Sequence, residues 1–206
     1  MASLSLPVVE TFHSLQGEGL HAGRSAFFIR LAGCTVGCSW CDTKHSWPEA
    51  AHPSRSLEQL AAETRAAAEA GAAFVVITGG EPLHHNLDDL CSVLQPVGLP
   101  LHLETSGVDP LSGHFDWVTL SPKRHKPPLP QLLATCHELK VVVHEGEDLA
   151  FAEAMAAAAA AAGNCPALLI QPGWESKQGP GLGVNYVKTH PTWRLSLQSH
   201  KQLGVR

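Results

Sequence analysis

The chain lacks the features that mark most nucleic-acid-binding, membrane and secreted proteins. Its 14 Lys and Arg are outnumbered by 19 Asp and Glu, so there is no basic excess to attract nucleic acid. No apolar run approaches the roughly 18 residues that a membrane span needs, and the alanine tract at 156–162 is too short. Residues 1–11 lack the charged and apolar parts of a cleavable leader. We therefore expect a cytoplasmic protein that binds neither nucleic acid nor membrane.

A linker and an internal repeat are also missing, which favours one domain over residues 1–206. The composition, 44% hydrophobic and 16% charged, is that of an ordinary globular protein, and the chain is long enough to bury a sizeable core.

Seven short segments rich in Val, Ile, Leu and Phe are predicted to be parallel strands covered on both faces. They are residues 26–31, 73–77, 99–104, 117–120, 139–143, 167–170 and 194–198. Helices are predicted at 57–70, where Ser56 and Gln59 form a capping box, and at 87–94, 149–162 and 182–188. The segment 122–130 contains four prolines and is predicted to start as a loop.

Strands that alternate with helices predict βαβ units with right-handed crossovers. A full barrel of eight units takes about 250 residues, more than this chain has. We therefore predict an α/β fold, an incomplete TIM-like barrel of about six βα units in which some crossover helices are shortened or missing.

Three cysteines with the spacing C-x3-C-x2-C, Cys34, Cys38 and Cys41, follow the first predicted strand, and no fourth cysteine lies nearby. Three thiolates hold three of the four irons of a cubane iron–sulfur cluster and leave the fourth iron open. Active sites of parallel barrels lie at the C-terminal ends of strands, which is where this loop lies. A second interpretation stays open: His45 could complete a zinc site in a zinc-stabilised binding module.

The sequence Gly79-Gly80-Glu81-Pro82 follows the next predicted strand. Two glycines at a strand end let a ligand approach the backbone, whose N–H and C=O groups can then bind it. The cysteine loop and this turn together resemble the radical S-adenosylmethionine superfamily. In that superfamily the open iron chelates S-adenosylmethionine, and one electron cleaves the cofactor to a 5′-deoxyadenosyl radical that takes hydrogen from the substrate.

Further motifs, spread from about Val9 to Arg206, look like those of the 7-carboxy-7-deazaguanine synthase family. They are residues 15–19, 22–24, Arg30, 41–43, 104–107, 121–123, 171–172 and 193–201. The resemblance implies a radical lyase that converts 6-carboxy-5,6,7,8-tetrahydropterin to 7-carboxy-7-deazaguanine with release of ammonia, on the route to queuosine and other 7-deazapurine nucleosides. It implies a 4Fe-4S cluster, S-adenosyl-L-methionine and Mg²⁺ as cofactors, a flavodoxin-like electron donor and a homodimer.

The resemblance also assigns residues, none of them catalytic beyond cofactor and substrate ligands. The cluster ligands are Cys34, Cys38 and Cys41, and Thr43 is the Mg²⁺ ligand. The cofactor-binding residues are Trp40, Cys41, Asp42, Gly80, Ser121, Pro122, Lys123, Gln171 and Pro172. The substrate-binding residues are Leu15, Gln16, Gly17, Glu18, Arg30, Thr78, His200 and Arg206.

Simple chemistry fits two of these roles. Glu18 can accept two N–H groups from the edge of a pterin ring, and Arg30, directed inward, needs an anionic partner such as the substrate carboxylate or Glu104. Trp174 departs from the family pattern, and Arg206 adds a cation to the tail. A small radical activase that makes a glycyl radical on a partner enzyme remains an alternative, since it would share the cysteine loop without needing Glu18, Arg30 or Thr43.

Overall fold

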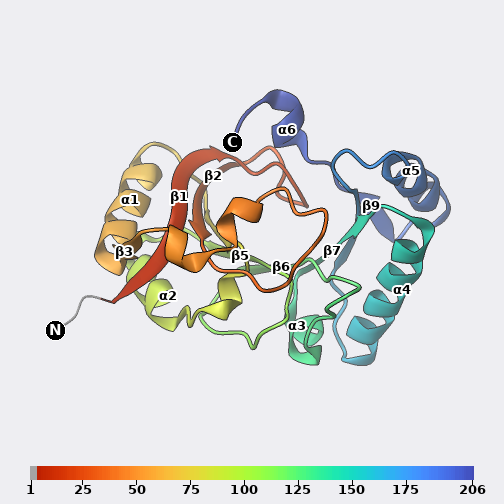
Figure 1. The fold of residues 1–206 in the computed structure, drawn as a ribbon, viewed down its shortest axis with the longest axis horizontal. Helices are drawn as coiled ribbons and strands as arrows, with labels where there is room; N and C mark the ends of the chain where they lie inside the picture. Colours follow the sequence, from red (N-terminus) through yellow and green to blue (C-terminus); the bar gives the residue numbers. More distant parts are fainter. Residues whose placement is uncertain (1–3) are drawn as a thin grey trace.

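A computed structural model describes residues 4–206, which form one sheet of nine strands with helices along it (Figure 1). The strand order is β3-β1-β2-β4-β5-β6-β7-β8-β9. The seven strands β2 and β4 to β9 are parallel neighbours, whereas β1 runs antiparallel to both β2 and β3. The end strands β3 and β9 do not pair with each other in this part of the chain, so the sheet stays open.

The strands are β1 (Ser5–Leu15), β2 (Ser25–Leu31), β3 (Ser54–Ser56), β4 (Val75–Gly79), β5 (Leu101–Thr105), β6 (Trp117–Leu120), β7 (Glu138–Val143), β8 (Ala167–Pro172) and β9 (Trp193–Leu195). The α-helices are α1 (Leu57–Glu69), α2 (Asp88–Leu94), α3 (Pro130–Thr135), α4 (Gly146–Ala161), α5 (Gly179–Thr189) and α6 (Ser199–Leu203). Short 3-10 turns include η1 (Lys44–Ser46) and η3 (Pro82–His84).

Six connections join the seven parallel strands, which confirms the prediction of an incomplete barrel of about six units. The connection from β5 to β6 has no α-helix, and the one from β6 to β7 has only the six-residue α3. The predicted capping box is present, because Ser56 accepts from the N–H of Gln59 and the Gln59 side chain accepts from the N–H of Ser56.

The sequence did not predict two strands and two helices, which are β1, β3, α3 and α6. β1 contains Pro7 and polar residues, and its only fully buried positions are Pro7 and Val8, so it lacks the continuous apolar run of the parallel strands. α4 begins at Gly146 rather than 149, because Glu145 and Asp148 cap each other one turn earlier. The last predicted strand shortens to three residues.

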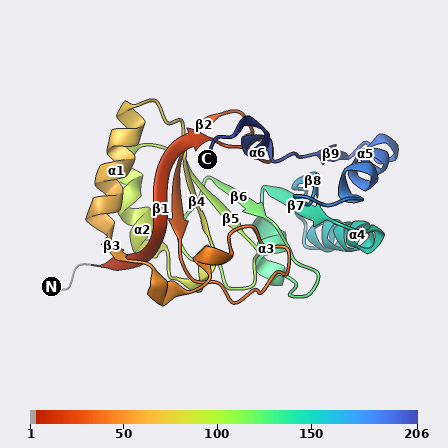
Figure 2. The same ribbon diagram turned by 45° about the horizontal axis from the view of Figure 1, so that its top comes forward.

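The alternation of side chains along the parallel strands separates an apolar face from a polar one. Ile29, Ile77, Leu103 and Leu139 point into the main core between the sheet and the helices α1 to α5, which lie along its outer side (Figures 1 and 2). Neighbouring residues of the same strands, described below, point to the inner face. None of the helices in residues 4–206 combines the length and the apolar character that crossing a membrane requires.

Candidate functional site

A pocket of about 280 Å³ lies on the inner face of the sheet, at the C-terminal ends of the parallel strands. The loops after β2, β4, β5, β6 and β8 all contribute to its lining. Every site residue expected from the sequence lines this pocket except Pro122 and Pro172. The lining residues therefore come together as predicted, although their individual roles remain predictions.

The cysteine loop reaches the pocket because two glycines let the β2 and β4 ends approach each other. A Cβ atom on Gly79, whose φ is +143°, would lie 2.1 Å from the carbonyl oxygen of Leu31. A Cβ atom on Gly80 would lie 2.4 Å from the carbonyl oxygen of Gly33 and 2.8 Å from the Cβ of Cys34. The glycine pair is thus required for close packing against the loop, in addition to any role toward a ligand.

The three cysteines are free thiols with the chemistry that a cluster needs. Burial raises the pKa of Cys34 and of Cys38, and the other cysteines add to this effect, whereas backbone hydrogen bonds at Cys34 and the Lys123 ammonium near Cys38 oppose it. Thiols bind iron as thiolates, so cluster binding releases their protons and must offset the cost of ionising them in this partly buried loop. The donor set therefore fits a cluster with three thiolate ligands.

The zinc interpretation finds no support in the geometry. His45 is exposed, and within residues 4–206 no group of three or more His, Cys, Asp or Glu side chains is arranged around one point as a metal ion requires. Cluster thiolates differ in this respect, because each one binds a separate iron.

Glu18 is the centre of the polar network in the pocket. Its Oε2 forms an ion pair with Lys140 of β7 and accepts from Gln171 Nε2 at 3.1 Å, while its Oε1 accepts from Gln198 Nε2 at 2.8 Å. Burial by itself raises the pKa of Glu18, but Lys140 and these hydrogen bonds outweigh it and hold the pKa at about 2. Glu18 is therefore a carboxylate at every physiological pH.

Glu104, Glu138 and Lys140 form a set of inward charges. Burial lowers the pKa of Lys140, but the three surrounding glutamates more than reverse this and raise it above its usual value. Glu104 accepts from Gln16 Nε2 at 2.9 Å and from Thr78 Oγ1 at 3.3 Å, and Glu138 accepts from the N–H of Leu20 at 2.8 Å. Sequence reasoning gave no role to Glu138 or Lys140, although polar residues alternating within the apolar strand β7 were the available signal.

Arg30 points to the inner face as expected, but its partner is not Glu104. Its Nε lies 3.0 Å from Oε1 of Glu10, a residue of the unpredicted strand β1. Arg206 lies 3.0 Å from the other oxygen of the same carboxylate, so Glu10 holds two guanidinium groups. Both guanidinium groups also lie 5.9 Å from the centre of the Phe12 ring.

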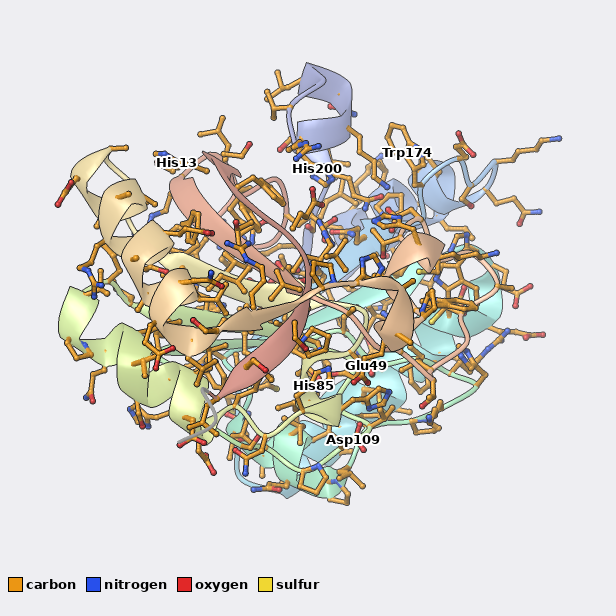
Figure 3. The ribbon with its side chains drawn as sticks, turned by 60° about the vertical axis from the view of Figure 1, so that its left-hand side comes forward. His13, Glu49, His85, Asp109, Trp174 and His200 are labelled. Carbon is orange, nitrogen blue, oxygen red and sulfur yellow. The ribbon has the colours of Figure 1, made fainter. Side chains whose placement is uncertain are left out.

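The C-terminal helix α6 closes one side of the pocket. Lys201 forms an ion pair with Asp42 of the cysteine loop and lies 4.7 Å from the centre of the Trp174 ring. His200 packs onto Gly17, where a Cβ atom would lie 2.1 Å from its Nδ1. Figure 3 shows Trp174 and His200 on the side of the molecule where α6 lies. Trp174, which the sequence left without a role, is thus an anchor for Lys201.

Three further lining residues have partners inside the site. Lys123 donates to Ser121 Oγ at 2.8 Å, and burial lowers the pKa of Lys123 although the nearby Cys38 thiol opposes the effect. Gln171, besides contacting Glu18, accepts from Ser196 Oγ at 2.8 Å. The Thr43 hydroxyl lies 3.5 Å from the Cys41 sulfur.

Comparison with known proteins agrees with this geometry. Residues 28–123 match the family model described as "Radical SAM superfamily". The chain is 53% identical to the 7-carboxy-7-deazaguanine synthase of Prochlorococcus marinus, over 98% of this chain and 99% of that protein. It is 34% identical to the Escherichia coli K12 protein of the same name, over 98% and 100% of the two chains. The crystal structure of QueE from Escherichia coli superposes with a TM-score of 0.81 at 32% identity and covers 95% of each chain.

Proposed function

The chain belongs to the 7-carboxy-7-deazaguanine synthase family of radical S-adenosylmethionine lyases, and on that premise we propose that its pocket converts 6-carboxy-5,6,7,8-tetrahydropterin to 7-carboxy-7-deazaguanine with release of ammonia. The reaction belongs to 7-deazapurine biosynthesis, the route that leads to queuosine. The observation that carries the proposal is that one pocket holds three free cysteines, Glu18 and Arg30 in a chain that aligns over almost its whole length with these relatives.

Membership of the superfamily implies a 4Fe-4S cluster and S-adenosylmethionine. We assign the cluster to Cys34, Cys38 and Cys41, and the cofactor to the pocket wall that they share with Gly80, Ser121 and Lys123. Together the two groups supply, when bound, the radical that takes a hydrogen atom from the substrate. The protein's part is to hold both groups, to keep water from them and to place the Lys123 ammonium beside the thiolate charge of Cys38.

The substrate's pterin edge presents N–H donors, and we assign their acceptor to Glu18. A carboxylate offers about four acceptor positions. Lys140, Gln171 and Gln198 use three of them. A pterin edge that donates two hydrogen bonds therefore displaces one of the two glutamine amides, while Lys140 keeps the carboxylate ionised.

The substrate's carboxylate is assigned to Arg30. Arg30 contacts Glu10 through Nε, and a guanidinium has five N–H donors, so Arg30 retains donors for a substrate carboxylate. Leu15, Gln16, Gly17, Thr78 and His200 line the remaining wall of the substrate region.

The proposal also includes a Mg²⁺ ion bound beside the substrate. It keeps water and substrate oxygens as ligands and needs few protein groups, so the single hydroxyl of Thr43 is a sufficient protein ligand beside the substrate carboxylate. A flavodoxin-like electron donor, a homodimer and a cytoplasmic location likewise stay predictions.

An anaerobic turnover assay tests the function. Reconstituted protein given S-adenosylmethionine, Mg²⁺, a reductant and the carboxytetrahydropterin should release ammonia and form the deazapurine, and the variant Cys38→Ser should do neither. Cys165→Ser is the matched control and should keep the activity, because Cys165 is an exposed cysteine that does not line the pocket. A cluster-loaded protein that releases no ammonia would contradict the proposal, and formation of a glycyl radical on a partner enzyme instead would favour the activase.

A further inference from the structure

Two consecutive histidines that the function leaves without a role, His84 and His85, lie on either side of the first cluster cysteine. His84 Nε2 is 3.0 Å from the backbone nitrogen of Thr35 and 3.1 Å from its hydroxyl, one residue after Cys34. His85 Nε2 is 2.7 Å from the carbonyl oxygen of Ala32, two residues before Cys34. The two histidines therefore hydrogen-bond to the backbone before and after Cys34.

The partners of the two rings require opposite tautomers. Nδ1 of His84 bonds to Asp109 Oδ2, a carboxylate oxygen that can only accept, so His84 donates from Nδ1 and its Nε2 accepts from the Thr35 N–H. His85 must donate from Nε2 because a carbonyl oxygen can only accept. Asp109 thus fixes Nε2 of His84 as an acceptor. Figure 3 shows His85 and Asp109 on the side of the molecule away from α6.

Backbone hydrogen bonds hold the same two segments together. The N–H of Gly80 donates to the carbonyl of Leu31 at 3.0 Å, and the N–H of Glu81 donates to the carbonyl of Gly33 at 2.9 Å. The segment 80–85 therefore contacts successive positions of residues 31–35. From the loop after β6, Lys126 adds a bond to the Thr35 carbonyl at 3.3 Å.

The backbone groups that follow Cys34 act in two directions. The Thr35 N–H points to His84, whereas the backbone groups of Val36 and Gly37 act on the Cys34 thiol, whose pKa they lower against the raising effect of burial. Hydrogen bonds to the sulfur ligands of an iron–sulfur cluster stabilise its reduced form and raise its reduction potential. By holding the Thr35 N–H away from the Cys34 sulfur, His84 therefore also orients the next two amides toward that sulfur.

We propose that Asp109, His84 and His85 form a clasp that positions Cys34 and its inward-facing amides, and that this clasp sets the retention and the reduction potential of the cluster. They are positioning residues, since none of them lines the pocket. The inference rests on the assignment of Cys34 as a cluster ligand in the proposed function.

The test compares the variants His84→Leu, His84→Gln and His85→Leu with the native protein. His13→Leu is a matched control, because His13 lies on β1, bonds to Ser25 and is apart from the clasp in Figure 3. Each protein is reconstituted anaerobically without S-adenosylmethionine or substrate. Iron release to a chelator and the reduction potential from an EPR-monitored titration are then measured, with a thermal melt to check folding.

His84→Leu should release iron roughly tenfold faster, as expected for a lost partner of a metal-binding segment. Its cluster potential should move to a more negative value, because the freed loop no longer aims its amides at the sulfur. His85→Leu should release iron faster as well. His84→Gln retains an acceptor for the Thr35 N–H and should behave like the native protein, as should His13→Leu.

If His84→Leu binds no cluster, the result for His84→Gln is used instead. Native-like iron release and reduction potential in His84→Gln support the clasp, whereas failure of His84→Gln to retain a cluster contradicts it. Native release and potential in all histidine variants also overturn it. A native protein that binds no cluster at all would instead contradict the proposed function, so the two failures are distinguishable.

Discussion

The pair of Glu18 and Lys140 is the individual contact on which the interior of the pocket most depends. The Lys140 side chain is only 5% exposed and that of Glu18 only 15%, so both charges are largely separated from water and each is a main partner of the other. Removing one member of a buried ion pair leaves an uncompensated charge, whereas replacing both members by neutral groups costs much less.

We therefore expect Glu18→Gln to lower the free energy of unfolding by about 3 kcal/mol, measured by urea denaturation of the cluster-free protein. Lys140→Met should have a similar effect, and the double variant should be less destabilised than the sum of the two. Strict additivity of the two substitutions would contradict the coupling.

Thr43 is a second residue whose role one substitution decides. Thr43→Ala removes the hydroxyl assigned to Mg²⁺ and its 3.5 Å contact with the Cys41 sulfur but keeps all three cysteines, so the cluster should still form. The variant's turnover should lose most of its response to added Mg²⁺, measured as ammonia release over a Mg²⁺ series. A native Mg²⁺ response would count against the assignment.

Among the elements, β1 shapes the site more than its sequence suggests. It brings Glu10 and Phe12 beside Arg30 and then leads into the loop that presents Gln16 and Glu18. This eleven-residue antiparallel strand with a mixed pattern thus supplies a partner for Arg30, for which the sequence had offered the substrate carboxylate or Glu104.

The helix α6 provides the other element-scale prediction. It has only five residues, too few to be stable alone, and depends on contacts such as Lys201 with Asp42 and with the Trp174 ring. A cation over an exposed ring contributes about 0.5–1 kcal/mol.

Trp174→Ala should therefore weaken S-adenosylmethionine binding to the reconstituted protein by about two- to fivefold, measured by equilibrium dialysis. Trp174→Phe retains a ring and is the matched control. Equal affinities in the two variants would exclude the ring contact as the cause.

At the scale of the whole molecule, the inner face of the sheet has two layers. Polar residues fill the layer at the C-terminal strand ends, where the pocket opens. At the opposite ends of the strands lies an aromatic layer, in which His102 stacks on Phe74 with ring centres 4.2 Å apart and lies 4.7 Å from His21. Burial, with help from His21, Arg24 and His137, lowers the pKa of His102 to about 3, although Asp116 opposes the shift.

This layer makes stability sensitive to acid. The folded protein keeps His102 neutral while the unfolded chain binds a proton near pH 6.5, so stability should fall as the pH drops from 6.5 toward 3. One such group contributes at most about 1.4 kcal/mol per pH unit. His102→Leu should reduce the difference between the urea midpoints at pH 7 and pH 5, and the exposed control His13→Leu should not. An unchanged difference in His102→Leu would refute this explanation.

The sequence by itself determined what local patterns can encode. Apolar runs located the seven parallel strands, the missing fourth cysteine indicated an open cluster, and the motif residues indicated a shared pocket. It could not determine pairings between distant residues. Glu10 lies 20 positions from Arg30, and Glu18 lies 122 positions from Lys140. Their contacts depend on strand order and register, which only the packing of the whole sheet fixes, because a side chain finds its partner through the fold and not through its neighbours in the chain. The cysteine spacing that predicts an open iron position is local in the chain, whereas the proposed clasp around Cys34 exists only because β2 and β4 are neighbours.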